Sequence, residues 1–480
     1  MSLSQVLRES EMDEFLTGNP QITYFKSVYR RHTPFYKGVH TYQEHKPLEE
    51  SKVNESLSYG SYDLITNIFL ENKIEQAEGT TYANLGNNIV EDIIFKVGQT
   101  ELYHTYGLYM ETRAELDHPY VPSCNASGTS PPTLVNVSPT FKCNTGSQYN
   151  VQTMAGGVTG HDAVTTTDTF YTFPNFYFCR EYGSAFPICA LNNSEVVLEI
   201  NYRSSEDISS SNITSASYTS TVNVEYVDLS DDERMRFINN TDIYYYYDVI
   251  QHHLGKTEKG ISYPLRQIFL VGKHDSTGST ITSKSTPVSL TAARSSAVLT
   301  DVDIKVNSDP LYDDTTDISI FTKQNLNRLY PGYGRELGFN RIKVTIHAAY
   351  ASDHAVGSIV TQTSATGILA EAYSKTSSTN TTIFVIVTSN SPFTSTTTAT
   401  TINSISANAT AITHEPLGYN DSIGVHSFCL DTTNTPSGHL SANVPFSINL
   451  TATDKTKIQT YLEVIKFYKI MGGQLGPQYI

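Results

Sequence analysis

The sequence predicts an all-β protein made of two antiparallel β-sandwiches in tandem, joined by a short helix and interrupted by long loops. Segments rich in β-branched and aromatic residues recur along the 480 residues, separated by polar turns that contain glycine and proline. Helix signals are few and do not alternate with the strands, which argues against an α/β fold. One strand–turn–strand segment also occurs twice, once in each half, which indicates the duplication of a domain-sized unit.

The repeated segment reads EDIIFKVGQTELYH at residues 91–104 and TDVDIKVNSDPLYD at residues 300–313, an ungapped match at an offset of 209 residues. Each copy has a strand, a polar turn and a return strand, the pattern of a β-hairpin. Two unrelated hairpins could converge on this similarity, so the alternative to duplication stays open here. The identical pairs are Asp92/Asp301, Lys96/Lys305, Val97/Val306, Leu102/Leu311 and Tyr103/Tyr312.

Residues 227–240, VDLSDDERMRFINN, contain the clearest helix start in the chain. Ser230 can cap the first free N–H groups, and Glu233, three residues later, can complete a capping box. Asn239 and Asn240 can end the helix, because asparagine tolerates the left-handed conformation. We therefore expect a linker helix over residues 229–241, between two sandwiches of similar length.

The first sandwich is expected over residues 24–228, after an N-terminal arm, residues 1–23, that carries one short acidic helix at 9–16. Strand-like segments lie at 62–75, 89–103, 169–178, 196–202 and 222–227, with one helix candidate at 106–116. Residues 118–168 are rich in Pro, Gly, Ser, Thr and Asn. So long a connection is more often functional or exposed than part of a core.

The second sandwich is expected over residues 242–480. Its first strand has four consecutive tyrosines, Tyr244 to Tyr247, which place aromatic rings on both faces. A Ser/Thr-rich insertion at about 338–413 contains two apolar segments, 342–350 and 382–388, that could pair in a small cap. Because the insertion and the 118–168 loop both follow the matched hairpins, duplication predicts that they emerge at corresponding corners of the two sandwiches. Their Ser, Thr, Asn and Gly content suits solvent, so we expect both on the outer surface.

Composition restricts the function. The formal net charge of −16 makes a general role in coating nucleic acid improbable, because phosphate would be repelled. The N-terminus lacks a signal-peptide pattern, and the longest apolar run, 383–387, is far too short to span a bilayer. Tyrosine (32 residues) suits surfaces that become buried on association. The one basic cluster, Lys26, Arg30, Arg31 and Lys37, fits a solvated loop or a site for an anion or partner.

The five cysteines form no C-x-x-C pair, which argues against a disulfide scaffold and a cysteine zinc site and favours a reducing compartment. They are Cys124, Cys143, Cys179, Cys189 and Cys429.

No catalytic, cofactor-binding or metal-binding residue is predicted. His252 and His253 point to opposite faces of a strand and cannot share one metal without a bend. Asp301 and Asp303 could chelate calcium, but no oxygen-rich loop follows them. The remaining candidates are Asp313, Asp314 and Asp317, which are more typical of a helix cap, and Gly332, Gly334 and Gly338, whose spacing does not fit a dinucleotide site. We expect neither enzyme activity nor a cofactor.

Several motifs resemble the major capsid proteins of nucleocytoplasmic large DNA viruses. The most specific is LTGNPQITYFKSVYRRH at residues 16–32, which is similar to the N-terminal signature of that family. Tyr177 stands where tryptophan is usual, and Glu181-Tyr182 replaces an Asn-Pro pair. Residues 338–413 are not covered by the resemblance. The other matching segments are 173–191 (FPNFYFCREYGSAFPICAL), 231–237, 427–440 (SFCLDTTNTPSGHL) and Met471-Gly472-Gly473.

The resemblance implies a double jelly roll, in which two tandem eight-stranded jelly-roll sandwiches form a homotrimeric, pseudo-hexagonal capsomer. Such capsomers tile the icosahedral shell of a large double-stranded DNA virus and contact neighbouring capsomers, penton and minor capsid proteins. The protein would lie near an internal viral membrane without inserting into it and without direct nucleic-acid contact. Host-surface contact through the outer loops is a further expectation, as are assembly in the host cytoplasm and a final location in the virion capsid.

The alternative from another functional class is a carbohydrate-binding or carbohydrate-degrading double β-sandwich protein. Such a protein would need clustered aromatic residues and paired carboxylates on one concave face, and usually a secretion signal. The lack of a signal pattern and of tryptophan argues against it.

Overall fold

The computed structural model describes most of the two sandwiches, and the expectations for residues 1–23 and 118–167 lie outside the described residues. The residues described are 32–57, 62–74, 85–117, 168–204, 218–252, 263–272, 299–312, 321, 325–330, 340–347, 359–362, 365–369, 381–387, 399–402, 405–415, 423–432, 437–441, 444–452 and 458–478.

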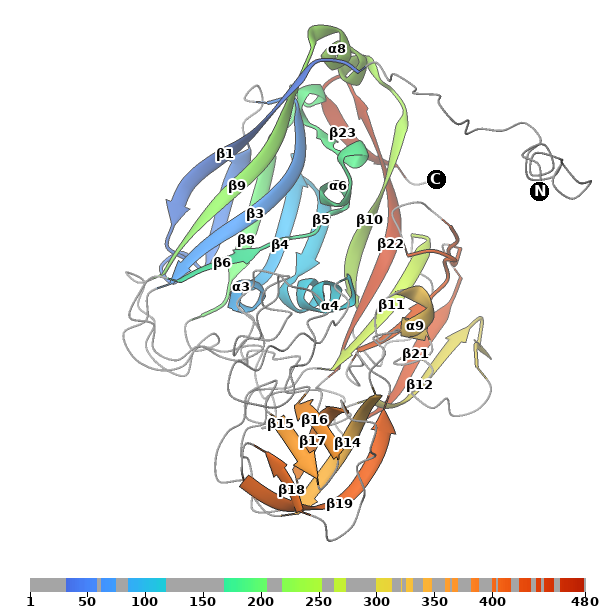
Figure 1. The fold of residues 1–480 in the computed structure, drawn as a ribbon. Coiled ribbons are helices and arrows are strands. Elements are labelled where there is room, and N and C mark those ends of the chain that lie inside the picture. Colours follow the sequence, from blue (N-terminus) through green and yellow to red (C-terminus); the bar gives the residue numbers. More distant parts are fainter. Residues whose placement is uncertain are drawn as a thin grey trace, which may run out of the picture.

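The first half is a sandwich of two antiparallel sheets (Figure 1). One sheet has the order β1 (Phe35–His45), β9 (Tyr218–Leu229), β3 (Leu64–Ile74) and β6 (Asp168–Thr172), and the short β7 (Phe186–Pro187) also pairs with β3. The other sheet has the order β2 (Lys52–Leu57), β8 (Val196–Tyr202), β4 (Val90–Val97) and β5 (Thr100–Tyr106). The helical turns of this half are α3 (Leu85–Asn88), α4 (Gly107–Asp117), α6 (Tyr177–Arg180), η1 (Tyr182–Ser184) and η2 (Ile188–Ala190).

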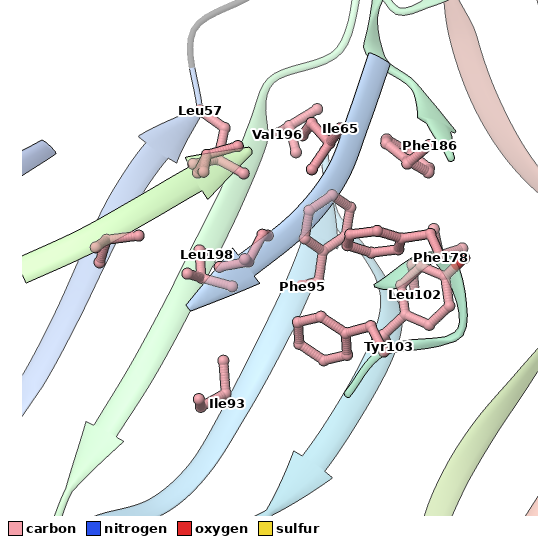
Figure 2. Packing of buried hydrophobic residues seen from close by; sticks show 14 of the residues in the cluster. Leu57, Ile65, Ile93, Phe95, Leu102, Tyr103, Phe178, Phe186, Val196 and Leu198 are labelled. Carbon is pink, nitrogen blue, oxygen red and sulfur yellow. The ribbon is translucent and has the colours of Figure 1, made fainter. Parts of the chain in front are cut away.

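An aromatic cluster fills the space between these sheets (Figure 2). The Phe95 ring on β4 lies 5.0 Å from that of Phe186 and 5.3 Å from that of Phe178, centroid to centroid. The return strand β5 adds Tyr103, whose ring is 5.8 Å from Phe95. Offset and edge-on aromatic pairs at these distances each add about 0.5–1.5 kcal/mol beyond the area that they bury. The predicted hairpin therefore forms and supplies the centre of the first core.

The second half repeats this sheet order. One sheet runs β10 (Ile243–His252), β22 (Ile458–Met471), β11 (Leu265–Gly272) and β20 (Ile423–Ser427), and β23 (Gln474–Gln478) also pairs with β22. The other runs β13 (Asp309–Pro310), β12 (Leu299–Val306) and β21 (Phe446–Ala452). The short α9 (Asn325–Leu329) lies beside β20.

The two predicted hairpins occupy equivalent places. β4 lies between β5 and β8, and β12 lies between β13 and β21. The chain reverses through Gly98 at φ 59° in the first half, and through Asn307 at φ 54° and Ser308 at φ 72° in the second. The matching topology supports duplication over chance similarity of two hairpins.

The predicted linker helix forms as α8 (Asp231–Asn239) with Ser230 and Asn240 at its two ends, but the predicted capping interactions do not form. Ser230 makes no side-chain cap, and the Glu233 carboxylate that would complete the box instead accepts a hydrogen bond from Thr33 Oγ1 at 2.7 Å. Asn240 is extended at φ −71° and ψ 129° instead of left-handed. The helix is held instead by Arg234, whose Nε donates to Asp63 Oδ1 at 2.7 Å.

The long insertion of the second half forms a closed barrel between β13 and β20, with strand order β14-β17-β16-β15-β18-β19. The predicted pairing of its two apolar segments is correct, because Ile342 lies opposite Val385. The barrel lies at the end of the molecule opposite α8 (Figure 1). Its strands are β14 (Asn340–His347), β15 (Ile359–Gln362), β16 (Ala365–Leu369), β17 (Thr381–Val387), β18 (Ala399–Ile402) and β19 (Ile405–Glu415).

In the first half, α4 and residues 118–167 likewise lie between β5 and β6, the counterparts of β13 and β20. The helix predicted at 106–116 is thus α4, and both long insertions follow the same pair of strands. Among the helices that the structure describes, none is both long and apolar enough to cross a membrane.

Candidate assembly surfaces

The described part of the chain brings no group of three or more His, Cys, Asp or Glu residues together to hold a metal. His252 ends β10. Asp303 on β12 forms an ion pair with Lys305 at 3.2 Å, which competes with any chelation together with Asp301. The other sequence candidates, His253, Asp313, Asp314, Asp317, Gly332, Gly334 and Gly338, lie outside the described residues.

The three described cysteines, Cys179, Cys189 and Cys429, are free thiols. Lys37, the one described member of the basic cluster, lies within β1 and not in a turn. Its Nζ is 3.9 Å from the centroid of the exposed Tyr182 ring, a cation–π contact.

A buried surface lies between the two sandwiches, where β10 packs on the first half. The ring of Tyr246 is 4.9 Å from that of Tyr103 on β5, and the ring of Tyr247 is 5.0 Å from that of Tyr177 on α6. Both β10 tyrosines belong to the same apolar cluster as the core of the first half. The run of tyrosines predicted to present rings on both strand faces therefore joins the two sandwiches.

Helix α4 extends the contact over the outer face of the second sandwich. The ring of Tyr109 is 5.4 Å from Phe269 on β11 and 5.6 Å from Tyr461 on β22. Arg113 of the same helix donates to the Tyr330 hydroxyl at 2.9 Å, and that hydroxyl donates to Gln267 Oε1 at 2.9 Å. Apolar contacts and a buried hydrogen-bond chain thus hold one sandwich against the other.

A fully buried carboxylate, Glu463 on β22, lies at the centre of this contact. Its Oε2 accepts from Arg266 at 2.7 Å within the second half, and its Oε1 accepts from Arg180 of the first half at 3.2 Å. Burial alone would raise the pKa of Glu463, but the guanidinium groups of Arg266, Arg180 and Arg113 hold that pKa below its usual value. The arrangement keeps Glu463 ionised, and its hydrogen bonds to Arg180 and Arg266 link the two halves.

A second charged group at the contact is Asp248, next to the tyrosines on β10. It accepts the backbone N–H of His104 at 2.8 Å and pairs with Lys466 at 2.5 Å. These residues line a cleft of about 190 Å³ between β5 and β10. The Asp248–Lys466 pair lies within the second half, and the His104 N–H bond to Asp248 connects that pair to the first half. The cleft therefore suits cohesion of the two halves better than the binding of a ligand.

The C-terminal hairpin also attaches to the first half. The turn between β22 and β23 contains Gly472 and Gly473, at φ 60° and 77°, and Asn193 donates to both of their carbonyls, at 2.9 and 3.0 Å. A Cβ atom on Gly473 would lie 1.5 Å from Asn192 Oδ1, so only glycine fits there. The Met-Gly-Gly motif seen in the sequence is thus a point where hydrogen bonds hold the two sandwiches together.

The outer edge of the first sandwich is exposed. β1 pairs with β9 on one side, and Phe35, Tyr36 and Val39 are exposed along it. On the second half, Leu311 and Leu430 are also exposed. Exposed apolar residues on an edge strand favour aggregation unless a partner covers them. The sequence alone does not reveal this surface, because exposure depends on which neighbours reach the strand.

A family model described as the N-terminus of the major capsid protein matches residues 23–247. This part of the chain is thus similar to the N-terminal part of the major capsid proteins. The major capsid protein of Pyramimonas orientalis virus is 28% identical over 240 residues, covering 49% of this chain and 54% of that protein. The major capsid protein of Paramecium bursaria Chlorella virus 1 is 28% identical over 255 residues, covering 49% of each. The chain thus spans about half the length of the curated relatives that it matches.

Solved structures of capsid proteins match over nearly the whole chain. The quasi-atomic model of the PBCV-1 virus capsid has a TM-score of 0.58 at 17% identity and covers 95% of this chain and 100% of that one. The Faustovirus major capsid protein has a TM-score of 0.50 at 10% identity, covering 96% and 94%. At these identities the likeness concerns the fold, which is the double jelly roll expected from the sequence.

Proposed function

We propose that the chain is the major structural subunit of the icosahedral capsid of a large double-stranded DNA virus, and that three copies form a pseudo-hexagonal capsomer. The observation that carries this proposal is the repetition of one sheet order in two sandwiches fixed together by a buried interface. Three such chains present six similar units around a threefold axis, which gives a nearly hexagonal tile. The capsid relatives support this function over the carbohydrate-binding alternative.

The mechanism is geometric, and we propose no enzyme activity. Residues 24–228 and 242–480 would form the two jelly rolls around the linker at 229–241. Neighbouring capsomers, penton proteins and minor capsid proteins would be the partners, close to an internal membrane that the chain does not enter. The net charge of −16 argues against direct nucleic-acid contact. Assembly would take place in the host cytoplasm, and the mature location would be the virion capsid.

The proposed orientation places the barrel and residues 118–167 outside, where they could contact the host surface, and residues 1–23 beneath the capsomer. Its support is that both insertions follow equivalent strands and that the barrel lies at the end opposite α8 (Figure 1). Limited proteolysis of intact particles should then cleave the insertions first. Protection of both insertions in virions, with cleavage in free capsomers, would reverse the orientation.

The oligomeric proposal is tested by light scattering and negative-stain microscopy of the purified chain. We expect three times the mass of one chain and a pseudo-hexagonal outline. A stable monomer or dimer at micromolar concentration would contradict the capsomer proposal.

A further inference from the structure

The two sandwiches can be aligned residue by residue through a shared irregularity in their strands. β3 has a β-bulge between Ile65 and Asn67, and β11 has one between Leu265 and Gln267. Just beyond the bulges, both strands read Ile-Phe-Leu, at 68–70 and 268–270. A bulge is a specific feature of a strand, so this coincidence fixes the register of one half on the other.

The same register extends to the edge strands. Asn67 and Gln267 lie opposite Glu225 and Glu463, the two glutamates at corresponding places on β9 and β22. Glu225 in turn lies opposite Val39 on β1, and Glu463 lies opposite Val249 on β10. Val39 is therefore the counterpart of Val249, and Tyr36, three residues earlier, is the counterpart of Tyr246.

These equivalent residues differ sharply in exposure. Val249 is 6% exposed and Tyr246 is 3% exposed, whereas Val39 is 54% and Tyr36 is 64% exposed. The residues of β10 are buried because β5, α4 and α6 of the first half cover them. No described residue gives β1 the same cover.

The second half contains counterparts of the covering elements, and each of them carries an exposed leucine. β13 follows β12 as β5 follows β4, and Leu311 is 39% exposed whereas its sequence match Leu102 is fully buried. The segment after β20 takes the place of α6 after β6, and there Leu430 is 85% exposed. β1 and the β12–β13 hairpin lie on opposite flanks of the molecule, so one chain cannot join its own two surfaces (Figure 1).

We propose that the β1 edge of one copy docks against the flank of a second copy formed by β13 and the segment after β20. This contact repeats between copies the packing that β10 makes within the chain, and it rests on the proposed capsomer. The two surfaces differ, so the interface is head-to-tail, and a ring of three closes if each step has the same rotation as the step within the chain. Lys37 on β1 and the exposed Asp309 on β13 give the surfaces opposite charges.

The test uses one charged substitution on each flank of the full chain. Val39→Asp, with Tyr36→Asp as a second variant, places a carboxylate in the β1 surface, and Leu430→Asp places one in the opposite surface. Met235→Asp is the control, because Met235 on α8 is also exposed but belongs to neither surface. Circular dichroism and the melting temperature verify folding, and light scattering at micromolar concentration measures mass.

We expect the flank variants to lose the trimer and behave as monomers, and the Met235 variant to keep it. An equimolar mixture of Val39→Asp and Leu430→Asp should give dimers, because one intact surface of each kind remains available. This interface would be overturned if the wild type is trimeric and the folded flank variants stay trimeric, or if the two monomeric variants fail to pair. Either result would leave the capsomer proposal intact. A monomeric wild type would instead refute the capsomer itself.

Discussion

The buried ion pair between the sandwiches gives the sharpest prediction. Replacing Arg180 with alanine removes the guanidinium that the first half contributes to the fully buried Glu463. Breaking a buried pair completely costs about 3–5 kcal/mol, because it leaves an uncompensated charge. Arg266 remains 2.7 Å from the same carboxylate, and the lost contact is longer, at 3.2 Å. We therefore expect a smaller destabilisation of about 2–3 kcal/mol.

The pH dependence of this variant has a definite sign. The pKa of Glu463 is lowered in the folded protein, so the stability from this group is present above its unfolded pKa and is lost as pH falls through the folded value. Without Arg180 the folded pKa rises, and the acid loss should begin at a higher pH. Arg180→Ala should thus shift the onset of acid unfolding upward relative to wild type.

The assay is urea unfolding, followed by tyrosine fluorescence and far-ultraviolet circular dichroism, at neutral and acidic pH. Lys52→Ala is the matched control, because Lys52 Nζ lies only 2.6 Å from Glu199 but its side chain is half exposed. Lys96 remains 2.7 Å from the same Glu199 carboxylate, and the half-exposed Lys52 is solvated, so the control should lose only about 0–1 kcal/mol. If Arg180→Ala costs no more than Lys52→Ala, the buried pair does not hold the halves together.

The other predictions concern single residues. Burial lowers the pKa of His426 to about 4, so the free energy of unfolding should fall as pH drops from about 6.5 towards 4. His426→Leu should reduce that loss in acid-unfolding curves, and an unchanged acid profile would contradict this expectation. Gly473→Ala should loosen the C-terminal hairpin more than Gly472→Ala, because a Cβ added at Gly472 meets nothing within 4 Å and bears only a backbone cost of about 1–2 kcal/mol. Hydrogen exchange at β23 would measure the difference, and equal effects would refute the steric argument. Arg234→Ala should destabilise α8 more than Ser230→Ala, because Arg234 bonds Asp63 whereas the Ser230 side chain makes no cap. The reverse order in hydrogen-exchange rates of α8 would show that the cap matters.

Features encoded within a few residues could be predicted from the sequence. The hairpin at 91–104 combines period-two apolar residues with a turn that tolerates positive φ, and both signals are local. The linker helix was predicted from Ser230, Glu233 and the two asparagines at its ends, which mark the helix although their capping interactions do not form. Helix α4 was predicted from its apolar spacing, and the pairing of 342–350 with 382–388 followed from two short apolar strands. The family resemblance also depended on contiguous motifs, such as residues 16–32.

Features that depend on distant neighbours could not be predicted. The Glu233 carboxylate meets Thr33, 200 residues away, and this contact replaces the predicted capping box. Likewise, the hairpin repeat is evident in the sequence, but the Ile-Phe-Leu repeat at 68–70 and 268–270 is only three residues long and gains structural meaning from the aligned bulges.

The sequence by itself determined that the chain forms two related β-sandwiches around a short helix, since strand period, turn chemistry and helix signals act over a few residues. The tertiary structure decided which equivalent positions became buried. Val39 and Val249 have the same side chain and the same place in their sheets, yet only Val249 is covered within the chain. Burial is a property of the surroundings, and the surroundings of β10 come from segments more than 60 residues away in the sequence.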